Sequence, residues 1–241
     1  MIFMPGYYYG GFYGGGYVLV LIAALLSLLA SANVQMTFKR YSNKKTSRNI
    51  TAEQAARKIL DENGLQNVRI ESIAGNLTDH YDPRSNVIRL SDSVRTSTSV
   101  AAVGVAAHEA GHAVQHAVGY FPIKLRNALV PVANFGSTAG PYLIIIGLLL
   151  SGAFSDFLVN FGIWFFSAAV LFQIVTLPVE FNASNRAIKT LSSGLYLESD
   201  EVPAVKKVLG AAAMTYVAAA AVSVANLLRF IMLAGSRRRR D

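Results

Sequence analysis

The sequence contains no cysteine among its 241 residues. Disulfide bonds and thiolate metal sites are therefore excluded, and any zinc ion must be held by nitrogen and oxygen ligands. Charged residues are also scarce, at 15% of the chain against 53% hydrophobic residues. This composition is too apolar for an ordinary soluble domain and indicates that part of the chain lies in a lipid bilayer.

Charge is absent from the whole N-terminal region, because the first charged residue is Lys39. Residues 1–16 are rich in glycine and tyrosine, and we expect a flexible tail at the level of the lipid headgroups. Residues 17–38 are apolar and about as long as a helix must be to cross a hydrocarbon core of roughly 30 Å, so we predict a transmembrane helix. A signal peptide is the alternative, but its basic start is missing.

The net charge of +8 does not predict nucleic-acid binding, because no basic surface interleaved with aromatic residues accompanies it. Much of the positive charge lies beside apolar segments, and this placement predicts attraction to anionic lipids. By the positive-inside tendency, it also predicts a cytoplasmic location for residues 39–127. A C-terminal arginine cluster outside the cell would conflict with that tendency if the last apolar block crosses the membrane. The basic residues in question are Lys39, Arg40, Lys44, Lys45, Arg48 and Arg237 to Arg240.

The remaining apolar blocks divide the rest of the chain. We expect a mainly α membrane protein with about four transmembrane helices and a small α+β domain outside the membrane. The last block is rich in alanine and contains Arg229, so it is the weakest candidate span. The predicted segments are the small extramembrane domain at 39–127, transmembrane helices at 128–150, 157–177 and 209–233, a helix and loop at 178–208, and a basic tail at 234–241.

Local patterns predict the elements of the small domain. Thr51 and Gln54 form a capping box for a helix over residues 52–63, which Gly64 ends. Residues 68–71 and 86–90 have strand patterns, and the segment LTDHYDPRS between them is rich in turn residues. Small apolar residues at helical spacing predict a long, mostly buried helix from about residue 98 to 118.

The residues with the most chemical information are His108-Glu109-Ala110-Gly111-His112, an H-E-x-x-H pattern within that predicted helix. Two histidines four residues apart lie on one helical face, so both imidazoles can bind one zinc ion. Glu109 is then held beside the metal, where it can act as the general base toward the hydrolytic water. Chance is the alternative, but these polar groups are expensive to bury in an apolar helix without mutual compensation.

Catalytic zinc sites usually take three protein ligands, and His116 and Glu180 are the candidates for the third. A rise of about 1.5 Å per residue places His116 roughly 12 Å from His108 along the helix axis, too far to share a metal. Glu180 immediately follows a predicted membrane helix, where a carboxylate needs a partner such as zinc. We therefore favour Glu180, with a solvated acid paired to Arg186 or Lys189 as the alternative.

Four longer runs resemble a known family. LTDHYDPR, VAAHEAGHAVQHA, LRNALVP and LPVEFNASNRA are similar to those of the YugP-like bacterial membrane zinc metallopeptidases, over about residues 41–187. The resemblance implies a multi-pass protein of the bacterial plasma membrane with one Zn²⁺ per chain, held by His108, His112 and Glu180, and with Glu109 as the base. In more distantly similar membrane gluzincins an aspartate follows the ligand glutamate by four residues, whereas this sequence has Ser184 there.

Three features beside the motif stay open at this point. Ser184 or the following Asn185 can hydrogen-bond a ligand imidazole, but without the charge that strengthens its basicity. His80 and Tyr81 can donate hydrogen bonds to a tetrahedral oxyanion, and His80 is our further catalytic candidate, with an ordinary turn as the alternative. Residues 86–90 are a candidate edge strand that pairs with an extended peptide substrate.

These observations predict a membrane zinc metalloendopeptidase that cuts membrane-associated or unfolded polypeptides. Other membrane proteins are candidate partners, and nucleic acid is not. A non-proteolytic membrane adaptor that uses zinc for stability is the alternative, and it would close the fourth coordination position with a residue such as His80. A zinc transporter is a weaker alternative, because ionisable residues are nearly absent from the predicted membrane helices apart from Asp156 and Arg229.

Overall fold

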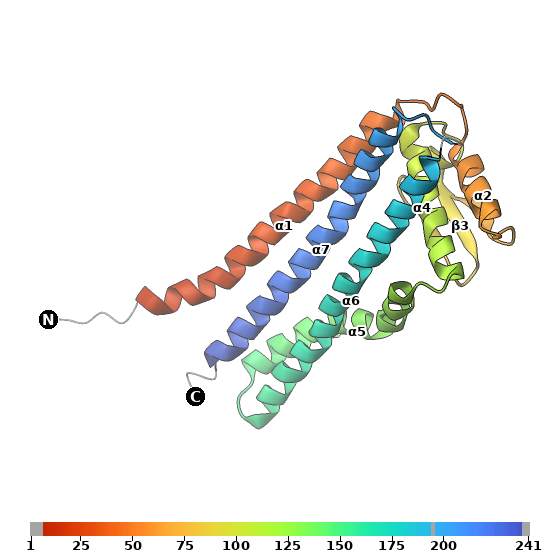
Figure 1. Cartoon of the computed structure of the whole chain (residues 1–241). Helices are drawn as coiled ribbons and strands as arrows, with labels where there is room; N and C mark the ends of the chain where they lie inside the picture. The colour runs from red at the N-terminus through yellow and green to blue at the C-terminus, as the bar shows by residue number, and fades with distance from the viewer. Residues whose placement is uncertain (1–6, 194–195, 238–241) are drawn as a thin grey trace. The chain divides into compact units, whose positions relative to one another are not determined.

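A computed structural model of the chain describes residues 7–193 and 196–237, which are mostly helical. Its contacts divide the chain into two compact units. The mixed unit comprises residues 30–124 and 177–215, and the helical unit contains the remaining described residues. The elements are α1 (Tyr7–Ser42), α2 (Ala52–Glu62), β1 (Arg69–Ile73), β2 (His80–Asp82), β3 (Val87–Ser91), α3 (Asp92–Arg95), α4 (Val100–Ala117), α5 (Phe121–Leu149), α6 (Ala153–Leu191) and α7 (Val202–Arg237) (Figure 1).

Among the described residues, four helices are long and apolar enough to cross a membrane, as the sequence predicted. Large apolar side chains on α1 point outward, and Leu21 and Leu28 are 68% and 69% exposed. An exposed apolar surface of this size is unfavourable in water, so it requires a lipid environment that covers it. The four segments are Gly16–Ser42, Phe121–Leu149, Ala153–Leu191 and Val202–Ser236.

The helices extend beyond the predicted boundaries. Helix α1 begins at Tyr7, so residues 7–16 are helical rather than a flexible tail, while residues 1–6 lie outside the described residues. Helix α7 begins at Val202 and reaches Arg237, beyond which the expected basic tail also lies outside the described residues. Once a long apolar segment has nucleated a helix, each further residue adds one hydrogen bond, which favours extension over the weak preference of glycine for coil.

Helix α6 is one continuous element through Pro178, where the sequence left open either a new helix or a kink. Helix α5 likewise contains Pro131 and Pro141. Proline removes one backbone hydrogen bond, and helices of membrane length tolerate this because neighbouring segments and local adjustments satisfy the freed carbonyl. The continuity of α6 is important for the metal centre, because it places Glu180 within a helix and not in a connecting loop.

The small sheet corrects two predictions. Its strand order is β1-β3-β2, with β1 parallel and β2 antiparallel to β3. Residues 80–82, expected in a turn, form β2, because His80 to Asp82 pair with Arg89 to Val87. The segment predicted as a substrate-pairing edge is β3, which both neighbours flank, so that hypothesis is wrong. The open edges belong to β1 and β2.

Helix α4 lies in the core of the mixed unit. Ser99 caps its first turn by accepting a hydrogen bond from Ala102 N at 3.2 Å. The capping box predicted for α2 is present, with Thr51 and Gln54 exchanging hydrogen bonds. Helices α2 and α4 pack together through small apolar side chains, and β3 contributes fully buried residues to the same cluster. Because α4 is buried on most of its surface, its few polar side chains face other parts of the protein.

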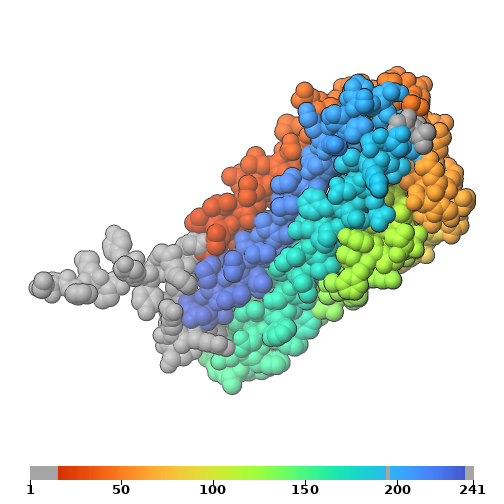
Figure 2. All heavy atoms as spheres, viewed as in Figure 1, coloured from red at the N-terminus to blue at the C-terminus, as the bar shows by residue number. Residues whose placement is uncertain are grey.

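Hydrogen bonds and ion pairs connect the segment that follows α1 to the segment that precedes α7. The buried Glu201 carboxylate accepts hydrogen bonds from Ser47 N at 2.7 Å and Ser47 Oγ at 3.0 Å. Two ion pairs, Lys44 with Asp200 and Arg48 with Glu198, lie beside it. Figure 2 shows these orange and blue segments against each other at the surface. The chain before α4 and the chain after α6 are thereby held together.

Candidate metal centre

Close packing of α4 against α6 builds the centre inside the mixed unit. A Cβ atom at Gly111 would lie 2.8 Å from the Ala183 carbonyl oxygen, a distance that real side chains do not adopt. The backbone of α6 therefore approaches α4 at Gly111, which has no side chain and lies between His108 and His112. Glu180 lies one turn before Ala183 on α6, so this approach brings its carboxylate to the histidine face of α4.

The structure brings the three predicted ligand residues together. His108 Nε2 and His112 Nε2 lie 3.1 Å apart, and Glu180 Oε2 lies 3.3 and 3.5 Å from them. Ligands at about 2.0–2.2 Å from a tetrahedral zinc stand roughly 3.3–3.6 Å from one another. The two distances to Glu180 lie in this range and the distance between the histidines is slightly shorter, so the group is close to the spacing that zinc requires. Among the described residues, no fourth histidine, aspartate or glutamate joins the group. A tetrahedral zinc ion held by these three residues would keep one position for water.

A buried glutamine fixes the chemical form of His112. Gln115 is fully buried, and its Nε2 donates to the Val179 carbonyl at 2.8 Å and to Asn182 Oδ1 at 2.9 Å. A carbonyl can only accept, so the amide oxygen of Gln115 must face His112 Nδ1, 3.0 Å away. Nδ1 therefore carries the proton. The lone pair of the neutral ring is then on Nε2, the atom that faces His108 and Glu180.

His108 has an equivalent support from α6. Its Nδ1 lies 3.1 Å from Ser184 Oγ, so both ligand imidazoles are oriented through Nδ1 and present Nε2 to the metal position. The sequence had named Ser184 as a candidate partner for an imidazole, whereas the role of Gln115 was missed. Its signal was available in principle, because Gln115 lies three residues after His112 and so on the same face of α4.

Glu109 and Glu180 place negative charge at the histidines. Burial lowers the pKa of His112, whereas its contact with Glu180 and the charges of Glu109 and Glu180 raise it, and the net result is a pKa above the usual histidine value. Glu109 is 8% exposed and stands beside the first histidine of the motif. The negative charge that stabilises a proton on Nε2 of His112 also stabilises a divalent cation next to that atom. A metal ion and a proton therefore compete for Nε2.

The other candidates are not members of this group. His80 is on β2, where its Nδ1 lies 2.9 Å from the Thr78 carbonyl, and it does not belong to the three-residue ligand group. Tyr81 donates a hydrogen bond from its hydroxyl to Asn86 at 3.0 Å, and burial followed by the charge of Asp82 raises its pKa. The ring of Tyr81 meets His116 edge-on at 6.2 Å, so His116 has a packing contact, in line with its exclusion as a ligand.

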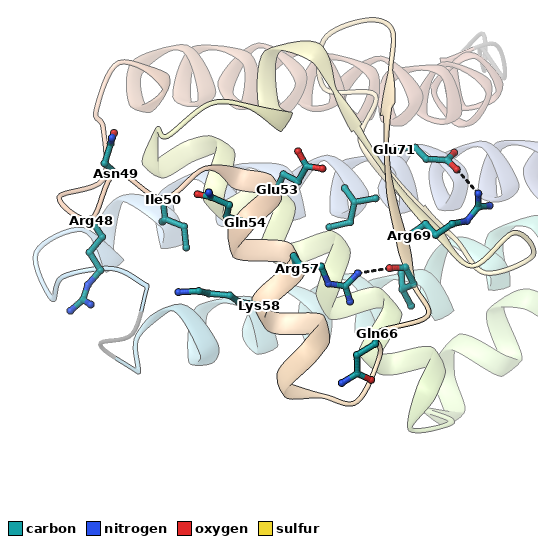
Figure 3. Close-up of a pocket in the computed structure, with 12 residues that line it drawn as sticks. Arg48, Asn49, Ile50, Glu53, Gln54, Arg57, Lys58, Gln66, Arg69 and Glu71 are labelled. Carbon is teal, nitrogen blue, oxygen red and sulfur yellow. Dashed lines mark hydrogen bonds and ion pairs between the residues drawn. The ribbon is translucent and has the colours of Figure 1, made fainter.

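A separate groove of about 1110 Å³ lies between α2 and the start of β1 (Figure 3). None of the three ligand residues lines it. Its arginines are engaged within the protein: Arg57 donates to the Val68 carbonyl at 2.6 Å, and Arg69 pairs with Glu71 at 3.1 Å. The groove is therefore not part of the site formed by the three ligand residues, although it is large.

Comparison with known proteins agrees with this geometry. A family described as "Putative neutral zinc metallopeptidase" matches residues 16–235, nearly the whole chain. The chain belongs to this zinc metallopeptidase family. It is also 48% identical over 218 residues to the Bacillus subtilis (strain 168) protein described as "Putative membrane protease YugP", covering 90% of this chain and 96% of that protein. No solved structure matches the chain.

Membership of the family confirms the resemblance found in the sequence. The family is described as a zinc metallopeptidase and the relative as a membrane protease, and the four helices of membrane length among the described residues fit a membrane protein. Zinc is the metal of the family, and His108, His112 and Glu180 are the donor set that this chain offers for it. Two imidazole nitrogens and a carboxylate oxygen are ligands that zinc accepts.

Proposed function

We propose that this zinc metallopeptidase is a membrane-embedded endopeptidase that hydrolyses peptide bonds with Glu109 as its general base. One observation carries the proposal: three donors of the correct kind stand at tetrahedral spacing, and no fourth protein donor among the described residues closes the group. A structural zinc site takes four protein ligands, whereas a catalytic site keeps one position open. The open position favours the enzyme over a zinc-stabilised adaptor.

Each residue then has a defined task. Zinc in such a site polarises the substrate carbonyl and lowers the pKa of water. His108, His112 and Glu180 hold the ion, and the Nδ1 contacts of the two histidines keep their rings in place. Glu109 accepts the proton of the attacking water and delivers it to the leaving amine, which conserves the proton through the reaction. His80 is a proposed donor to the oxyanion from β2.

Substrate recognition is proposed to use the open edge of β2. This strand contacts α4 and, within residues 7–193 and 196–237, pairs with β3 alone, so its outer backbone groups can pair with an extended peptide. Main-chain pairing is tolerant of sequence, which suits unfolded or membrane-associated polypeptides. Because basic residues follow α1, we propose that the mixed unit faces the cytoplasm of a bacterial cell. Membrane protein partners and anionic lipids are compatible with this placement.

The test of the mechanism is Glu109→Gln in the full-length protein. The variant is expected to retain one zinc per chain, because Glu109 is not in the ligand group, and to lose proteolysis by at least about a hundredfold, the lower range for general base catalysis. Metal content by atomic emission and cleavage of an unfolded, lipid-reconstituted protein are the two measurements. Asp200→Asn, at an exposed carboxylate of the same unit, is the matched control.

Two results would contradict the proposal. Undiminished cleavage by Glu109→Gln would remove Glu109 from the mechanism. A wild-type protein that binds stoichiometric zinc but cleaves no polypeptide under any lipid condition would favour the adaptor.

A further inference from the structure

A second cavity, of about 360 Å³, lies within the mixed unit between the end of α1 and the start of α7. Each helix presents one face to it, because the lining positions follow the spacing of helical turns. From α1 these are Asn33, Thr37, Arg40 and Tyr41, and from α7 they are Lys207, Gly210, Ala211 and Met214. We call it the α1–α7 pocket.

The α1–α7 pocket carries unbalanced positive charge. Arg40 and Lys207 line it, and no carboxylate does. Within the described part of the chain, neither side chain takes part in an ion pair, and the guanidinium carbon of Arg40 lies 5.7 Å from the centre of the Tyr41 ring. The larger groove beside α2 differs in this respect, since its arginines pair with carboxylates. Two exposed cations that converge on one cavity favour an anionic ligand.

The two cations of the pocket lie at the ends of the apolar segments of their helices. On α1 the apolar segment ends at Phe38 and the first charge is Lys39, one residue before Arg40. On α7 the order is reversed, because Lys207 precedes the apolar part of the span. Both cations therefore stand where their helices leave the hydrocarbon.

The lining changes from charged to apolar along α7. Past Lys207, one turn leads to Gly210 and two lead to Met214, which is 50% exposed. A Cβ atom at Gly210 would meet nothing within 4 Å, so this part of the pocket is open space. A ligand that fits has a negatively charged head beside Arg40 and Lys207 and an apolar continuation toward Met214.

We propose that the α1–α7 pocket binds one anionic phospholipid, with its phosphate between Arg40 and Lys207 and an acyl chain along the Gly210 and Met214 face. Basic pockets between membrane helices are known to hold lipid headgroups in this way. The inference is independent of the peptidase mechanism, because none of the metal ligands or Glu109 lines the pocket. A bound lipid would join α1 to α7 next to the contacts that Glu201 makes with Ser47.

The chain offers a closely matched control for a test. The double variant Arg40→Gln with Lys207→Gln removes both pocket cations, whereas Lys39→Gln with Lys206→Gln removes two cations at the neighbouring positions, outside the lining. Net charge and position along the membrane normal are almost the same in both. Full-length protein in neutral detergent would be titrated with phosphatidylglycerol or phosphatidylcholine, and bound lipid would be counted by native mass spectrometry.

We expect the wild type and the Lys39/Lys206 variant to retain one phosphatidylglycerol and no tightly held phosphatidylcholine. The Arg40/Lys207 variant should bind phosphatidylglycerol at least about tenfold more weakly, since each cation near an anionic headgroup contributes to affinity. Gly210→Leu, which fills the open part of the pocket without changing charge, should weaken binding as well. Zinc content of each variant checks that the mixed unit is folded.

Three outcomes would overturn the proposal. Equal loss of lipid in the two double variants would show diffuse surface attraction instead of a site. Unchanged binding in both the Arg40/Lys207 variant and Gly210→Leu would exclude the pocket. Displacement of the lipid by millimolar inorganic phosphate would identify a free-anion site in which the acyl chain has no part.

Discussion

At the scale of single residues, Gln115 connects the metal centre to its surroundings. One side chain orients His112 through Nδ1 and donates to the Val179 carbonyl, which adjoins Glu180. Two of the three ligand residues are therefore positioned through one buried amide. Both histidine partners are neutral, since the other is Ser184. A neutral partner strengthens the basicity of an imidazole less than a carboxylate does.

Replacement of Gln115 should therefore change metal affinity. In Gln115→Leu, the Nδ1 proton of His112 and the Val179 carbonyl both lose a buried partner, and we expect zinc affinity to fall by about 10- to 100-fold. Competition with a chromogenic chelator measures this affinity. Gln66→Leu, at an exposed position of the same unit, is the control and should bind zinc like the wild type. If Gln115→Leu had lower thermal stability but unchanged zinc affinity, Gln115 would contribute to packing and not to metal binding.

At the scale of elements, the contact of α4 with α6 determines whether the centre forms. Sequence patterns identified α4 itself, because small apolar residues at helical spacing are a local property of the chain. They did not identify β2, because three residues beside an Asp-Pro turn carry no alternation, and β2 exists only through pairing with β3. Nor could they place Pro178 inside a continuous helix, since proline fits both the first turn of a new helix and a membrane-length helix that continues through it.

A methyl group at Gly111 should separate the two helices. Its Cβ would meet the Ala183 carbonyl at 2.8 Å, and a backbone atom cannot rotate away as a flexible side chain can. We expect Gly111→Ala to lose about 1–3 kcal/mol of stability and to bind zinc poorly. Gly210→Ala, where the added Cβ meets nothing within 4 Å, should retain zinc and wild-type stability or better. Thermal unfolding and zinc content, measured in one detergent, distinguish the two, and similar values for both variants would contradict the role of Gly111.

At the scale of the whole molecule, the order of four membrane-length helices determines which segments share a side. If each helix crosses once, the mixed unit lies on one side of the membrane, and the α5–α6 connection lies on the other with both chain ends. The basic residues after α1 favour the cytoplasm for the mixed unit. The arginines at the C-terminus then lie outside, against the usual tendency, so orientation is a prediction that needs its own measurement.

The absence of cysteine makes this measurement direct, because single cysteines can be introduced without removing any. Asn76→Cys, exposed between β1 and β2, and Ser151→Cys, exposed between α5 and α6, mark the two sides. In intact cells a membrane-impermeant maleimide should label Ser151→Cys at once and Asn76→Cys only after permeabilisation. The reverse pattern would place the metal centre outside the cell, and labelling of both in intact cells would contradict four crossings.

The sequence by itself determined the apolar lengths that make a membrane protein and the spacing that puts His108 and His112 on one helical face. Both are local properties, because helical periodicity and backbone hydrogen bonding involve residues within a turn or two. Only the tertiary structure decided that Glu180 meets these histidines, that Gln115 orients one of them, and that β2 and not β3 is an open edge. Those facts depend on which surfaces pack together, and packing joins residues that are distant along the chain.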